Sequence, residues 1–168
     1  GRKVVKVLKV VINSSPIIFL VRLQALELFL NDNYEFYMTP SVVTEINAKS
    51  DEISRALTPV LAAEKLIVQS TNLTSLFNRL HKSFGRGESE TIALAKELQA
   101  DFVILDDLAA RKIATNLGLN VKGTLAILKK LVVDRKIEIG NKDEFYQNLV
   151  NIKFRISRSI FDAVFRDV

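Results

Sequence analysis

The sequence contains no cysteine and a single histidine among its 168 residues. Without cysteine the chain can form no disulfide framework, no thiolate metal site and no cysteine nucleophile, which suits an intracellular protein. The one histidine, His81, falls in a segment with a helical pattern, where we expect it on the surface. Serine remains available as a nucleophile.

Long apolar runs are also missing from the sequence. The longest charge-free run near the N-terminus lies between Lys9 and Arg22, and it contains an asparagine, two serines and a proline. No transmembrane helix can be built from it, and no secretory signal with a small-residue cleavage site is evident. We therefore expect no membrane partner and a cytoplasmic location.

The overall composition is that of an ordinary globular protein. Apolar residues make up 48% of the chain and charged residues 26%, which is enough apolar material for one domain with its own core. We expect residues 1–168 to form a single domain. The formal charge of +5 permits nucleic-acid binding without requiring it.

Strand-like and helix-like segments alternate along the chain. Predicted strands cover residues 4–12, 35–38, 66–69, 102–105 and 120–122. Predicted helices cover residues 17–30, 40–49, 51–65 with a break near Pro59, 73–83, 88–99, 107–117 and 124–133; Ser14 or Ser15 would cap the first, with Pro16 at its first position. Such alternation predicts an α/β fold with a parallel sheet covered by helices on both faces.

The C-terminal residues carry a different pattern. Two helical segments, 143–150 and 157–165, flank Phe154-Arg155-Ile156, and no linker rich in glycine, proline or serine precedes them. We interpret residues 141–168 as a helical extension packed on the same domain.

Polar residues that could carry chemistry gather where strands end and the following helices begin. They are Asn13, Glu45, Glu88, Glu90, Asp106 and Asp107. The carboxyl ends of parallel strands meet at one edge of the sheet, so these side chains could converge there. Converging oxygen ligands without histidine or cysteine indicate Mg²⁺ or Mn²⁺ and phosphoryl-transfer chemistry. Each acid taken singly has a structural alternative, as a helix cap, as a partner of the helix dipole or as an exposed helix residue.

A second pattern is basic. Between Arg111 and Lys136 there are seven lysines or arginines, at positions 111, 112, 122, 129, 130, 135 and 136, against one acid, Asp134. Such a surface would contact phosphates without reading sequence. A solvated helix face in a basic protein is the alternative interpretation.

Five stretches, taken together and in order, resemble PIN-domain proteins. They are N-S-S-P-I-I from Asn13, T-P-S-V-V-T-E-I around Glu45, G-R-G-E-S-E-T-I-A-L-A from Gly85, L-D-D-L-A-A-R from Leu105 and G-L-N-V-K-G-T-L-A-I-L from Gly118. The resemblance spans roughly residues 8 to 130. It is closest to a prokaryotic branch near the toxin ribonucleases of VapBC-type toxin–antitoxin pairs, and F-R-I-S in the tail is similar to that branch too.

The resemblance implies a Rossmann-like three-layer α/β/α sandwich that binds Mg²⁺ or Mn²⁺ in an acidic pocket and cuts RNA. By position in the motifs, the metal ligands would be Asn13, Glu45, Glu90 and Asp106, with Glu88 as the alternative to Glu90. The acids expected to act in catalysis are Glu45, Glu88, Glu90, Asp106 and Asp107. The residues expected to contact RNA are Ser15, Arg111, Lys112, Lys122, Lys129 and Lys130.

One position departs from the pattern of the family. Many active members carry aspartate where this chain has Asn13. An amide oxygen can still bind Mg²⁺, but one negative charge is lost, and a unit charge pair at 4 Å is worth on the order of 4 kcal/mol at an effective dielectric constant near 20.

Two functions therefore stay open on the sequence: a metal-dependent ribonuclease held in check by an antitoxin partner, and a weakened PIN-like module that binds nucleic acid or protein without cutting. The apolar helix predicted at 17–30 could serve a homodimer.

Overall fold

A five-stranded sheet forms the centre of the molecule. The structure is a computed structural model, and it describes residues 6–168. The strands are β1 (Leu8–Ile12), β2 (Tyr34–Met38), β3 (Ile67–Val68), β4 (Phe102–Ile104) and β5 (Val121–Lys122). All described pairings are parallel, in the order β3-β2-β1-β4-β5. The central strand β1 therefore ends beside β4, which brings Asn13 next to the residues that follow Ile104.

Helices connect the strands and account for most of the remaining chain. They are α1 (Ser14–Arg22), α2 (Leu26–Leu30), α3 (Pro40–Lys49), α4 (Asp51–Ala62), α5 (Thr74–His81), α6 (Arg86–Glu97), α7 (Leu108–Asn116), α8 (Thr124–Val133), α9 (Lys142–Asn151) and α10 (Arg158–Val164).

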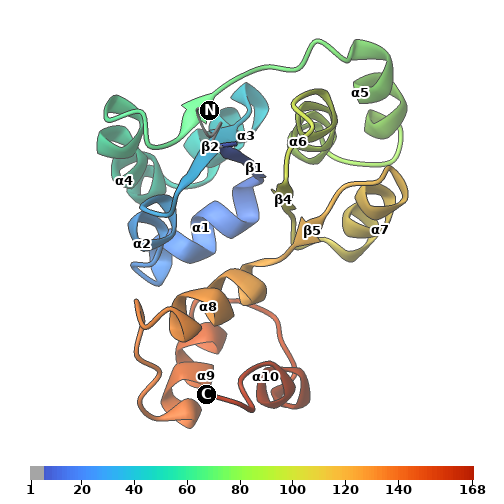
Figure 1. The fold of residues 1–168 in the computed structure, drawn as a ribbon. Helices are drawn as coiled ribbons and strands as arrows, with labels where there is room; N and C mark the ends of the chain where they lie inside the picture. Colours follow the sequence, from blue (N-terminus) through green and yellow to red (C-terminus); the bar gives the residue numbers. More distant parts are fainter. Residues whose placement is uncertain (1–5) are drawn as a thin grey trace, which may run out of the picture.

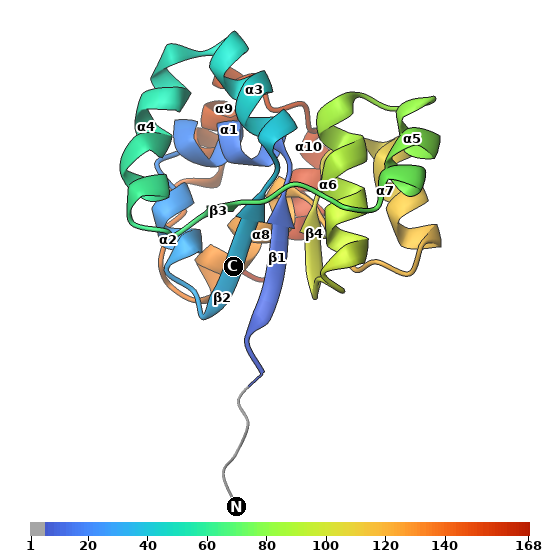
Figure 2. The same cartoon turned by 90° about the horizontal axis from the view of Figure 1, so that it is seen from above.

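The helices cover both faces of the sheet, as the alternating pattern predicts. Val10 and Ile12 of β1 face a core built with α1, α2, α3, α4 and α8, whereas Val11 faces a second core built with α5, α6 and α7. Figures 1 and 2 show these two helical layers on either side of the strands. The expected three-layer α/β/α sandwich is confirmed.

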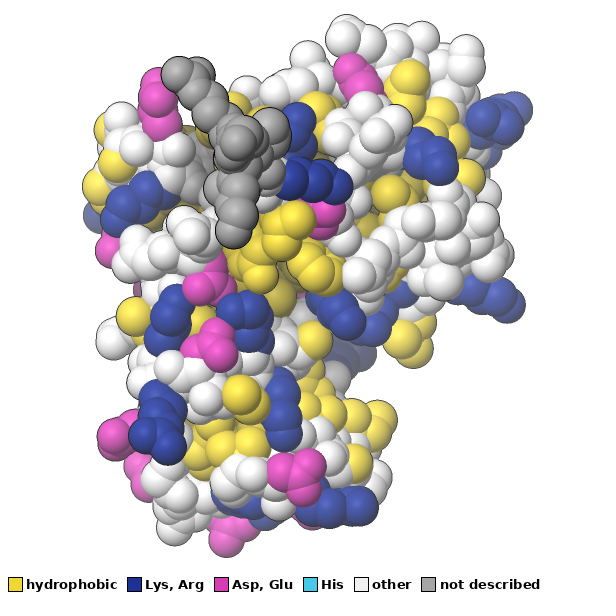
Figure 3. Space-filling model, viewed as in Figure 1, with side chains coloured by type: hydrophobic (Ala, Val, Ile, Leu, Met, Phe, Trp, Pro, Cys, Tyr) yellow, Lys and Arg dark blue, Asp and Glu magenta, His cyan; other side chains and the backbone are white. Residues whose placement is uncertain are grey.

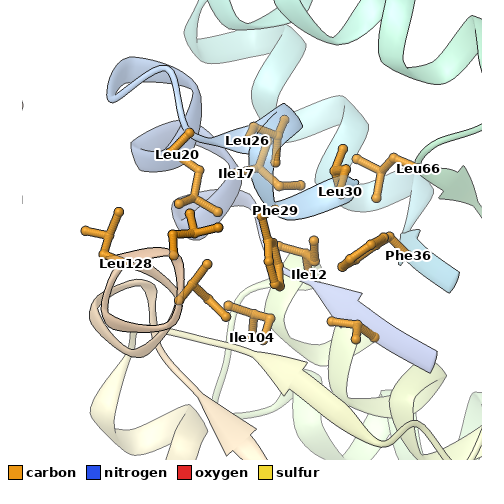
Figure 4. Close-up of a cluster of buried hydrophobic side chains, with 14 of the residues drawn as sticks. Ile12, Ile17, Leu20, Leu26, Phe29, Leu30, Phe36, Leu66, Ile104 and Leu128 are labelled. Atoms are coloured by element: carbon orange, nitrogen blue, oxygen red, sulfur yellow. The ribbon is translucent and has the colours of Figure 1, made fainter. Parts of the chain in front are cut away.

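The larger core lies between the sheet and the first helices. Figure 4 shows Ile17 and Leu20 of α1, Phe29 of α2 and Leu128 of α8 converging on Ile12 of β1. Phe29 also packs edge-on against Phe36 of β2, with 5.0 Å between ring centroids. This burial holds β1 and α1 rigidly together, and it fixes the position of the turn between them.

The helix predicted over residues 17–30 is wrong in two respects. It begins earlier, at Ser14, with Asn13 rather than a serine in the capping position, so Pro16 lies in the first turn instead of at the first residue. It also breaks after Arg22, because Gln24 adopts φ of 56° and the Ala25 N–H bonds back to the Leu20 carbonyl at 2.8 Å, a left-handed helix ending.

The break expected near Pro59 is absent from the described helix α4, which runs from Asp51 to Ala62. Pro59 removes the hydrogen bond to the Arg55 carbonyl and crowds it, but both residues are exposed on the solvent side of the helix. The strand predicted at 4–12 starts at Leu8; residues 4 and 5 of that prediction lie outside the described residues.

The C-terminal extension packs its aromatic side chains toward the larger core. Leu149 of α9, Phe161 of α10 and Phe165 belong to the same buried cluster as the sheet residues. Phe154 meets Phe19 of α1 edge-on, with 5.0 Å between centroids. In Figure 1, α8, α9 and α10 gather at one end of the molecule.

Apolar side chains of α1 and α2, on which the homodimer expectation depended, are inside this core. Ile17, Leu20 and Phe29 are each at most 2% exposed. These three side chains are therefore occupied within the chain.

Candidate functional site

Asn13 lies where the sequence predicts, at the carboxyl end of the central strand. Its backbone N–H donates to the Ile104 carbonyl at 3.1 Å, which ties the tip of β1 to the tip of β4. The side chain is 5% exposed, and its Oδ1 accepts a long contact of 3.5 Å from the Thr91 hydroxyl of α6. The amide oxygen therefore has one weak partner among the described residues.

Glu45 of α3 is held from two sides. The Ser14 hydroxyl donates to Oε2 at 2.8 Å, and the Gly87 N–H donates to Oε1 at 2.9 Å. Gly87 has to be glycine for this contact, because a Cβ built there would collide with the Glu45 carboxylate. Three elements, α1, α3 and the start of α6, thus fix one acid at the edge of the sheet.

Asp106, the second residue after β4, is held by a single residue. The Thr124 N–H donates to Oδ1 at 2.7 Å and the Thr124 hydroxyl donates to Oδ2 at 2.6 Å. A Cβ at Gly123 would lie 2.6 Å from Nη1 of Arg111 and 3.1 Å from Oδ1 of Asp106, so both groups press against this glycine. The first turn of α8 therefore positions Asp106 and lies beside Arg111.

Two predicted site acids make contacts typical of a structural role. Asp107 caps α7, since its Oδ1 accepts from the Ala110 N–H at 2.8 Å. Glu90 accepts from the Ser41 N–H in the first turn of α3 at 3.1 Å, which links α6 to α3. Both side chains keep a second carboxylate oxygen for other contacts.

Glu88, beside Gly85 at the start of α6, has one carboxylate oxygen without such support. Its Oε2 is buried and has no hydrogen-bond partner among the described residues. Burial, followed by the negative charges of Asp107 and Glu45, raises the pKa of the Glu88 carboxyl above its usual range. The Glu88 carboxylate thus lies within electrostatic reach of Glu45 and Asp107, and the three charges repel one another.

The chemistry of this donor set fits a hard divalent cation. Carboxylates and one amide oxygen are the ligands that Mg²⁺ and Mn²⁺ prefer, and Oε2 of Glu88 has no hydrogen-bond partner among the described residues. Within residues 6–168, no group of three or more His, Cys, Asp or Glu side chains is arranged to hold an ion directly. Mg²⁺ commonly keeps several waters and binds through one or two carboxylates, so the arrangement fits water-mediated binding.

The basic residues predicted to contact RNA divide into two groups. Lys130 is paired with Asp32 and Asp134, both at 2.8 Å, and the Lys129 ammonium donates to the Val164 carbonyl at 2.7 Å. The ion pairs raise the pKa of Lys130. Arg111, Lys112 and Lys122 form no ion pair within the described part of the chain.

Sequence reasoning missed residues that position the acids. Ser15 is half-buried on α1, and the hydroxyl that contacts an acid belongs to its neighbour Ser14. Thr124 was also missed; the available signal is a Gly-Thr pair between a strand and a helix, where a threonine hydroxyl commonly turns back to a nearby acceptor. Its partner Asp106 is 18 residues away, so the sequence does not reveal the pairing.

No helix in the described residues is long and apolar enough to span a membrane.

The chain is similar to one family of known proteins and to a solved structure. A solved structure of a PilT N-terminus domain protein from the hyperthermophilic archaeon Sulfolobus solfataricus P2 is similar over 73% of this chain and 92% of its own, with 22% identity and a TM-score of 0.48. A search of curated proteins found no match. A family model described as PIN domain matches residues 9–168, and the chain therefore belongs to the PIN-domain family.

Proposed function

We propose that the protein is a metal-dependent ribonuclease of the PIN type. Membership of the family supports a nuclease-type module. One observation carries the proposal further: the buried Oε2 of Glu88 has no partner and lies beside the charges of Glu45 and Asp107. An unpaired buried oxygen in a self-repelling group of acids is costly unless a cation compensates it.

In this proposal Glu88, Glu45, Asp106 and Asn13 would hold Mg²⁺ or Mn²⁺ through bound waters. The ion would supply an activated water and neutralise charge on the phosphate. The chain's own groups perform the positioning. Ser14 and Gly87 orient Glu45, and Thr124 orients Asp106 with its two hydrogen bonds.

Arg111 gives the site a cation for the substrate. Its guanidinium lies against Gly123 on the side where Asp106 also lies, and it forms no ion pair with the described residues. A guanidinium next to the candidate metal ligands is suited to bind the RNA phosphate. A narrower form of the proposal, a toxin inhibited by an antitoxin, adds the expectation that cleavage falls when that antitoxin is present.

A second candidate function, a PIN-like module that binds without cutting, is favoured by two observations. Asn13 lacks the charge that many family members have, and the oxygens of Glu45 and Asp106 already accept protein hydrogen bonds. Both features weaken the attraction of the site for a cation.

Mn²⁺ titration followed by calorimetry, with cleavage of a mixed RNA pool, separates the two functions. For the nuclease we expect Mn²⁺ binding and Mn²⁺-dependent cleavage in the wild type. Glu88→Gln should weaken Mn²⁺ affinity at least about tenfold, or about 1.4 kcal/mol, while Asn13→Asp adds a negative charge at the strand tip and should tighten it.

Glu138→Gln, an exposed acid in the connection between α8 and α9, is the matched control and should leave affinity unchanged. Absence of Mn²⁺ binding in both the wild type and Asn13→Asp would reject the nuclease and leave the binding module.

A further inference from the structure

A groove of about 910 Å³ lies between the body of the molecule and the C-terminal extension. One wall comes from the starts of α7 and α8, and the other comes from residues 154–164, which include the F-R-I-S motif. The surface is hollowed at this junction, with apolar and basic side chains along its border (Figure 3). Its volume falls within the range of pockets that enclose small organic groups, about 300–1,000 Å³.

The walls of the groove carry apolar side chains that face solvent. Leu108, the first residue of α7, is 81% exposed, and Ile160 of α10 is 55% exposed on the opposite wall. Phe154 and Ile156 continue the apolar lining on the side of the extension. Exposed apolar side chains on two facing walls mark a surface that buries something on binding.

The polar groups of the groove are mainly cationic. Arg111, Lys129 and Arg155 line it, whereas Asp106 is its one acidic side chain. Arg111 and Arg155 form no ion pair with any described residue. Asp106, held by Thr124, also belongs to the candidate metal site, so the groove starts at that site.

We propose that this groove holds the unpaired bases of single-stranded RNA next to the phosphate bound at the candidate metal site. The inference rests on the proposed function, because that function places a phosphate of the RNA at the candidate metal site. Bases present flat apolar faces to Leu108, Phe154 and Ile160, while their phosphates meet the cations. An RNA chain has this alternation of apolar bases and regular negative charge, and it would reach the groove directly from Asp106.

The C-terminal extension thereby becomes part of the substrate site. Residues 154–160 supply one wall of the groove, and Arg155 supplies a cation that the body of the molecule does not. The extension would select single strands, because the bases of a duplex are stacked and paired and cannot enter an apolar groove.

The test compares an RNA hexamer with an abasic hexamer of the same length, both bound in EDTA, so that neither cleavage nor the candidate metal site affects the result. The wild type should bind the RNA about tenfold more tightly than the abasic strand, or by about 1.4 kcal/mol, since the apolar side chains would remove the faces of the bases from water. The double variant Leu108→Ala/Ile160→Ala should bind the RNA and the abasic strand with nearly equal affinity. The logarithm of its affinity should still fall with the logarithm of the salt concentration as steeply as that of the wild type. Arg155→Ala should instead reduce that slope by about one phosphate contact.

Val133→Ala is the matched control, because Val133 is a 60% exposed apolar residue outside the groove. It should behave as the wild type does. Equal binding of RNA and abasic strand by the wild type, or an unchanged ratio in the double variant, would overturn the proposal and leave the groove to a protein partner. Neither result depends on Mn²⁺-dependent cleavage, so a failed nuclease assay would leave this test intact.

Discussion

The ionised side chain of Glu88 lowers the free energy of unfolding of the metal-free protein, because other acids of the site lie near it. Burial and the charges of Asp107 and Glu45 raise its pKa in the folded chain above the unfolded value of about 4.3. The folded state then binds more protons than the unfolded state between these two pKa values, so stability without metal falls as pH rises through that window. The cost is fully present only above the raised pKa of the folded state.

Glu88→Gln should therefore raise the melting temperature of the metal-free protein at pH 7, and the gain should vanish at pH values below about 4. Solvent partly screens the group, so we expect a rise of only about 1–3 °C. Thermal melts of the wild type, Glu88→Gln and Glu138→Gln between pH 4 and 8 measure it. A gain that persists unchanged at pH 4 would show that the charge of Glu88 is not the cause.

At the scale of the element, the junction of α3 with α6 depends on a residue without a side chain. The Glu45 carboxylate occupies the space that a Cβ at Gly87 would fill, and it accepts the Gly87 N–H. Alanine stabilises a helix by about 1 kcal/mol more than glycine does. This gain offsets part of the loss of the two hydrogen bonds of Glu45, each worth about 1 kcal/mol.

Gly87→Ala should thus change the melting temperature little, yet weaken Mn²⁺ binding about tenfold because Glu45 is displaced. Glu138→Gln is again the control, since Glu138 is exposed in the connection between α8 and α9 and should leave Mn²⁺ affinity unchanged. Mn²⁺ titration of the two variants decides the matter. Equal affinities would mean that Glu45 lies outside the metal site.

Elements whose determinants are local in the sequence could be predicted, whereas features that depend on contacts between distant segments could not. The helices at 40–49 and 124–133 were predicted correctly, because apolar periodicity and helix-starting residues are local in sequence. The break at Gln24 was not, because a left-handed residue other than glycine leaves no signature. Strand alternation placed Asn13 and Asp106 at one edge, whereas the contacts of Asp106 with Thr124 and of Glu90 with Ser41 arise only when distant segments meet.

At the scale of the whole molecule, the extension and the sheet share one apolar cluster. Phe161 is fully buried and packs against Phe165, Tyr146 and Phe145, with ring centroids 4.9 to 5.9 Å apart. The extension is attached further by the Lys129 ammonium, which donates to the Val164 carbonyl, and by Phe154, which packs on Phe19. These contacts join α10 to α8 and the connection between α9 and α10 to α1. Loss of packing in the extension should therefore destabilise the sheet as well.

Phe161→Ala should therefore lower the stability of the entire chain, by about 3–5 kcal/mol, and shift one cooperative transition downward by about 6–20 °C. Ile92→Ala, in the core on the other face of the sheet, should shift the same single transition by the smaller amount typical of an aliphatic truncation, about 2–5 kcal/mol. Calorimetry of both variants tests this, because a single domain must melt as one unit whichever core is damaged. If Phe161→Ala instead produced an early transition while the main one stayed at the wild-type temperature, residues 141–168 would be an independently melting unit, and the groove that they form with the body would open before the sheet unfolds.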